Sequence, residues 1–121
     1  MTVHSLAHAR MALGCGVPVT VLSAPSAGAY AGVGWWLALA RAAGAAVHVL
    51  DCGPAPGRAL EALRAGQRLL IVDAPPAQWA DIAARAAAAG GAVLPVRPPS
   101  LDLGQHGAER RLAEWLQTKP F

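Results

Sequence analysis

Polar and reactive side chains in this sequence follow short runs of β-branched and leucine residues that predict strands. Hydroxyl groups follow the first run, a carboxylate and a thiol follow the second, and a carboxylate and a guanidinium group follow the next two. In open parallel sheets, ligands bind outside the carboxyl ends of the strands, where the strand order reverses. This rule predicts a ligand site formed by Ser23, Ser26, Gly28, Tyr30, Gly32, Asp51, Cys52, Asp73 and Arg97.

The loop over residues 24–34 has features of an anion-binding turn. Gly28, Gly32 and Gly34 precede a predicted helix, whose free N–H groups and dipole favour an anion. Asp51 ends the next strand, about where a dinucleotide-binding fold places its ribose carboxylate. The spacing is GxxxGxG instead of GxGxxG, and the loop lacks the lysine of a P-loop. Two interpretations remain, a small anionic ligand or glycines that only form a turn, and no cofactor is assigned.

An enzyme that uses Asp51, Cys52 and Asp73 is the alternative function. The N-terminus of the following helix lowers the pKa of a thiol at Cys52, whereas the neighbouring Asp51 carboxylate acts in the opposite direction. No histidine lies nearby in the sequence, which favours a buried, inert cysteine. Two aspartates at adjacent strand ends can bind Mg²⁺. Capping of the next helix explains Asp73 equally well, so no metal is predicted.

The four histidines add no predicted metal site. His4 and His8 lie four residues apart on a predicted helix, but two ligands without a third make a poor site. We expect them on a solvated helix face. His48 falls in a buried strand, where a hydrogen-bonded core histidine is the ordinary case, and His106 precedes the last predicted helix.

Strands and helices alternate along the chain and position these residues. Each interval between two predicted strands holds one helix, which gives βαβ units, hence a parallel sheet with right-handed crossovers. Pro95 has no N–H for a ladder, so the fourth predicted strand should lie at an edge. The predicted strands are 17–23, 46–51, 68–73 and 92–96, and the predicted helices are 5–13, 34–43, 57–65, 75–89 and 107–117.

We therefore expect a single α/β domain over residues 1–121, with a four-stranded, Rossmann-like parallel sheet between helices on both faces. The preferred strand order is 2-1-3-4, and 3-2-1-4 is the alternative. Ser5 is expected to cap the first helix, and Asp73 the helix that begins at Pro75–Pro76.

Residues 47–96 resemble the βαβαβ part of STAS-type regulatory domains. Those domains present a phosphorylatable serine before a helix, in the region that corresponds to the turn Cys52–Gly57 here. This turn has no serine, and the first 45 residues do not match. The resemblance thus lacks the residue that would carry the function, and no family is assigned.

Charge and cysteine usage narrow the partners and the compartment. The net charge is +3, but the basic residues are spread thinly from Arg10 to Arg111, whereas nucleic-acid binding needs several cations on one face. Two cysteines do not make a disulfide framework, so a cytoplasmic protein with reduced thiols is expected. The apolar stretch after Arg10 imitates a signal peptide, but Gly14, Gly16 and Pro18 interrupt it. No apolar run is long enough to span a bilayer.

The chain is also unusually poor in charge. It is 55% apolar and 14% charged, against about 25% charged in ordinary domains, and its first 50 residues contain no acid. Trp35 and Trp36 point about 100° apart on a helix, so one should face the sheet and the other an interface or a ligand. We expect a homodimeric binding or regulatory module; a purely structural subunit of a larger assembly is a further alternative.

Overall fold

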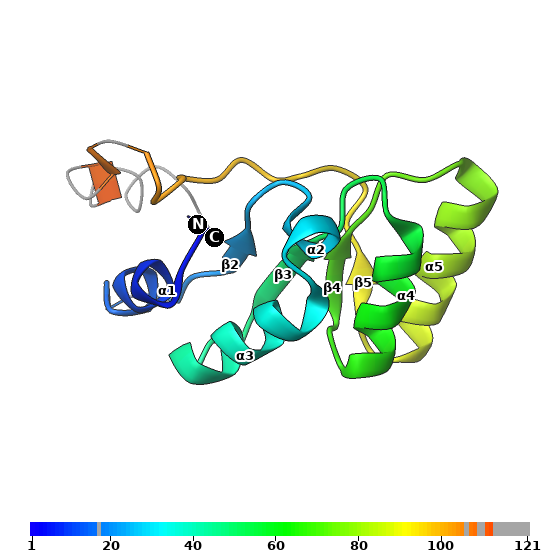
Figure 1. The fold of residues 1–121 in the computed structure, drawn as a ribbon, viewed down its shortest axis with the longest axis horizontal. Helices are drawn as coiled ribbons and strands as arrows, with labels where there is room; N and C mark the ends of the chain where they lie inside the picture. Colours follow the sequence, from blue (N-terminus) through cyan, green and yellow to red (C-terminus); the bar gives the residue numbers. More distant parts are fainter. Residues whose placement is uncertain (17, 106, 109–110, 113–121) are drawn as a thin grey trace.

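The architecture, seen in a computed structural model that describes residues 1–16, 18–105, 107–108 and 111–112, is one parallel sheet covered by helices (Figure 1). The strands follow one another in the sheet in the order of the sequence, β1-β2-β3-β4-β5, and every pairing is parallel. They are β1 (Thr2–Val3), β2 (Val21–Ser23), β3 (His48–Asp51), β4 (Leu69–Ile71) and β5 (Ala92–Val93).

Four helices begin and end close to where the sequence predicts them, whereas the short α2 lies in the loop predicted over residues 24–34. Ser5 caps the first helix, because its Oγ accepts a hydrogen bond of 3.2 Å from the backbone N–H of His8. Gly44 and Gly66 end the third and fourth helices in the left-handed conformation that glycine adopts without strain. The helices are α1 (Leu6–Leu13), the short α2 (Ala27–Tyr30), α3 (Val33–Ala43), α4 (Pro56–Ala65) and α5 (Pro76–Ala88).

The α/β class and the parallel sheet are confirmed, but the predicted four strands and the order 2-1-3-4 are wrong. The sheet has five strands in sequential order. Each right-handed crossover therefore moves to the next strand in the same direction, which places every connecting helix on the same face. For this reason the prediction of helices on both faces is wrong for the helices that connect the strands, and these described elements form two layers instead of three.

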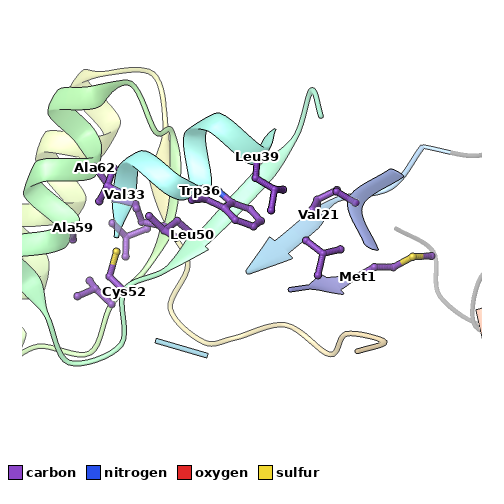
Figure 2. Close-up of a cluster of buried hydrophobic side chains, with 14 of the residues drawn as sticks. Met1, Val21, Val33, Trp36, Leu39, Leu50, Cys52, Ala59 and Ala62 are labelled. Atoms are coloured by element: carbon purple, nitrogen blue, oxygen red, sulfur yellow. The ribbon is translucent and has the colours of Figure 1, made fainter. Parts of the chain in front are cut away.

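The helix layer packs on the row of side chains formed by Val3, Leu50, Leu70 and Val93, which share one face of the sheet. Trp36 and Leu39 of α3 cover the middle of this face (Figure 2). The other helices contribute mainly small side chains to the core, Ala9 and Ala12 from α1, Ala59 and Ala62 from α4, and Ile82 and Ala86 from α5. Much of the high alanine content thus lies between the helices and the sheet.

Residues 95–103, which we call the strap, run from the end of β5 back to the opposite edge of the sheet (Figure 1). There the backbone of Thr2 donates to Leu101 O at 2.8 Å and accepts from Leu103 N at 3.0 Å. The strap thus lies along the outer side of β1, with Asp102 in a parallel bridge to Thr2. Most of the helix predicted at 107–117, and His106 before it, lie outside the described residues.

Candidate functional site

Arg97 joins the carboxyl ends of β2 and β3 to the first residue of β1. Its Nη1 donates to Asp51 Oδ2 at 2.8 Å, and its Nη2 donates to Thr2 Oγ1 and to the backbone oxygen of Ser23, both at 2.9 Å. The Asp51 side chain is 7% exposed and that of Arg97 is 25% exposed. The strap carries Arg97 to β1, β2 and β3, and we call these four residues the carboxyl-edge cluster.

Further hydrogen bonds complete the carboxyl-edge cluster. Asp51 Oδ1 accepts from Gly53 N at 2.9 Å, and Ser23 Oγ accepts from Asp51 N at 2.9 Å. Thr2 Oγ1 donates to Ser100 Oγ at 2.8 Å. The Arg97 guanidinium group is therefore paired with a carboxylate of the same chain. Its positive charge, which the sequence predicts to bind an anionic ligand, is already neutralised by Asp51. Sequence reasoning nominated Asp51, Arg97 and Ser23, but it missed Thr2 and Ser100, whose roles depend on the strap.

The predicted glycine site is a place of close backbone packing. A Cβ on Gly28 would lie 2.9 Å from Cys52 Sγ, and a Cβ on Gly53 would overlap Ser26 Oγ. Ser26 itself has a left-handed backbone, with φ of 61°, which side-chain-bearing residues adopt rarely. Gly28 therefore lets α2 lie against the end of β3.

The Cys52 thiol is fully buried in the core. Its residue is 0% exposed, and burial, followed by the charges of Asp51 and Glu61, raises its pKa to about 12. At neutral pH the group is a neutral thiol, whereas a nucleophile needs the thiolate. This environment matches the inert cysteine interpretation and gives no support to thiol catalysis.

The other predicted ligand residues lie around the α2–α3 turn and before α5. Tyr30 is 70% exposed. Gly32 begins α3 with φ of 92°, and a Cβ there would meet no described atom within 4 Å. Asp73 is exposed, and its predicted capping role is wrong, because α5 starts at Pro76 with Pro75 as its N-cap. Its backbone N–H donates instead to Gly53 O at 2.7 Å.

The adjacent tryptophans face different surroundings, as predicted. Trp36 is 0% exposed in the core, whereas Trp35 is 37% exposed. An interface on α3 can therefore use Trp35 but not Trp36, and the predicted interface remains a prediction for Trp35 alone.

His8 and His48 lie on the helix and the strand that the sequence predicts, whereas His4 does not lie on the helix. His4 lies before α1, not on it, and its Nε2 is 2.6 Å from Asp102 Oδ1 on the strap. Its backbone N–H donates to His8 Nδ1 at 3.1 Å. His48 packs edge-on to Trp36, and its buried Nδ1 has no hydrogen-bond partner in the described part of the chain. Among the described residues, no three His, Cys, Asp or Glu side chains form a group suited to a metal ion.

In the part of the chain that the structure describes, the sheet face opposite the helices is covered over only part of its width. Under the strap, Leu22 and Val49 are each 2% exposed. Farther along the same face, Leu69, Ile71 and Leu94 are partly exposed and Ala92 is exposed. The register pairs Leu69 with Ala92, and Leu94 N donates to Leu70 O at 2.8 Å, which places Leu94 beside Ile71. We call Leu69, Ile71, Ala92 and Leu94 the β4–β5 patch.

No family model matches the chain, and no curated protein and no solved structure is significantly similar to it. The resemblance of residues 47–96 to STAS-type domains therefore gains no support. Among the described residues, no helix is both long and apolar enough to cross a membrane.

Proposed function

We propose that this protein is an interaction module that binds a protein partner through the β4–β5 patch. The observation that carries the proposal is an apolar, partly exposed half-face of an all-parallel sheet. All-parallel sheets occur almost only with both faces covered, because their strands are apolar on both sides. Contiguous exposed apolar surface commonly marks an interaction site.

The chemistry of the opposite half of this face supports the same proposal. There the strap and the carboxyl-edge cluster cover the sheet, and Arg97, Asp51 and Thr2 are hydrogen-bonded to one another or to the chain. These groups hold the fold together, so the β4–β5 patch is the part of this face that the described residues leave accessible to another molecule.

Site-specific photocrosslinking in cells that express the full chain tests this proposal. A photoreactive residue replaces Ala92 on the patch, and in a control chain it replaces Ala84, which is exposed on α5. We expect protein adducts from position 92 and few from position 84. Equal yields at the two positions would contradict a binding role for the patch.

A small-ligand site at the carboxyl edge is the second candidate. It is favoured by the exposure of Tyr30 and Trp35 on either side of the open turn at Gly32. In this second candidate site Arg97 does not bind the ligand directly, since Asp51 already pairs with it. Native mass spectrometry tests it: a bound small molecule that is lost in a Tyr30→Ala chain supports the site, and a bare chain mass argues against it.

A further inference from the structure

The β4–β5 patch is free of charge. Its cross-strand rows are Leu69 beside Ala92 and Ile71 beside Leu94. The nearest strand position with an acid on this face is Asp51, beside Ile71, and its carboxylate is already paired with Arg97. Across a two-fold axis the same patch packs against its own copy, and a patch without charged side chains buries no unpaired charge in that contact. An uncharged apolar patch is therefore complementary to its own copy.

The edge of the sheet at β5 is poorly suited to association by strand pairing. Ala92 N and Leu94 N both donate to β4, at 2.9 and 2.8 Å, so the N–H of Val93 points outward. The next outward position is Pro95, which has no N–H to donate. Proline at an edge strand blocks extension of the sheet, which leaves the face as the surface for contact.

From these observations we infer that the partner on the β4–β5 patch is a second copy of this chain, with two sheets packed face to face about a two-fold axis. The inference rests on the proposed function and names its partner. A standard interface buries about 800 Å² on each side, roughly an eighth of the 6461 Å² surface of the chain. The contact must then extend from the patch onto the strap, where Val96 is 73% exposed.

Light scattering coupled to size exclusion, on the purified full chain at micromolar concentrations, measures the association. We expect a particle of twice the 12.3 kDa chain mass. Ala92→Arg should give the single-chain mass, because it places an unpaired cation in an apolar contact. Ala84→Arg is the matched control and should keep the dimer.

The outcomes separate this inference from the proposed function. A single-chain mass for the native protein, together with crosslinks from position 92 to a different protein, overturns the self-association and leaves the patch as a binding surface. A single-chain mass without crosslinks overturns both. A dimer that survives Ala92→Arg lies on another surface, such as the exposed side of Trp35, and also overturns the inference.

Discussion

Arg97 holds the strap to the sheet through a buried carboxylate, and its removal should be costly to stability. In an Arg97→Met chain, Asp51 keeps a charge that is 7% exposed and has lost its ion pair. Removal of one partner from a buried pair costs about 3–5 kcal/mol, and the partial exposure of Arg97 reduces this to about 2–4 kcal/mol. Urea denaturation followed by circular dichroism measures the change in unfolding free energy.

Two further variants show whether the charge or the packing is responsible. Arg85→Met removes an exposed pair with Asp81 in the same way and should cost less than about 0.5 kcal/mol. Arg97→Met combined with Asp51→Asn removes both charges and should recover part of the loss. If Arg97→Met costs no more than Arg85→Met, the ion pair has no role in stability.

At the scale of residues, the sequence predicted which side chains gather but not what they do there. Asp51, Ser23 and Arg97 were placed at strand ends by the hydrophobic runs before them, and parallel strands bring such ends to one edge. The hydrogen bonds of Arg97 could not be predicted, because they depend on where the strap crosses the sheet. Thr2 was missed because its strand has only two residues and carries no detectable pattern.

The turn between α5 and β5 depends on a glycine at position 91. A Cβ there would overlap the backbone oxygen of Arg68, which accepts a hydrogen bond from Ala92 N at 2.9 Å. Gly91→Ala should therefore displace β5 from β4 and cost about 2 kcal/mol or more. Gly57→Ala is the matched control, since its Cβ would meet no described atom within 4 Å in α4. This variant should raise stability by about 0.4–1 kcal/mol, and a similar loss in both chains would contradict the argument.

At the scale of elements, the sequence was a good guide to helices and a partial guide to strands. Alanine–leucine runs ended by Gly44 and Gly66 marked α3 and α4 correctly, because glycine adopts the left-handed end conformation. Pro95 correctly predicted that the last strand lies at an edge, as β5 does. The sequence predicts α5 but not its N-cap. The helix begins at Pro76 with Pro75 as its N-cap, so Asp73 lies too far before the first turn to cap it.

At the scale of the whole molecule, strand order was the part that sequence could not give. A connection that contains one helix is long enough to reach the adjacent strand of the sheet or to pass over one strand. The similar spacing of the predicted strands along the sequence is therefore compatible with sequential and with non-sequential strand orders. The choice decides the layers, since sequential steps leave one face without helices. It also removes the point of strand-order reversal on which the predicted ligand site was based. Part of the high apolar content of the sequence therefore lies on a sheet face that no connecting helix covers.

The whole chain should be most stable within a narrow window of mildly alkaline pH. Burial lowers the pKa of the Met1 ammonium from 8.0 to about 6 and lowers that of His48 below 6.5. The unfolded chain thus takes up protons first, and stability falls as the pH drops below about 8 and again below 6.5. The Cys52 pKa is raised from 9.0 to about 12, so the unfolded thiol ionises first and stability falls above pH 9.

Urea denaturation between pH 5 and pH 10 should give a maximum near pH 8–9. Cys52→Ala should flatten the alkaline decline, and His48→Gln should flatten the decline near pH 6; an unchanged profile in both chains would place the titrating groups elsewhere.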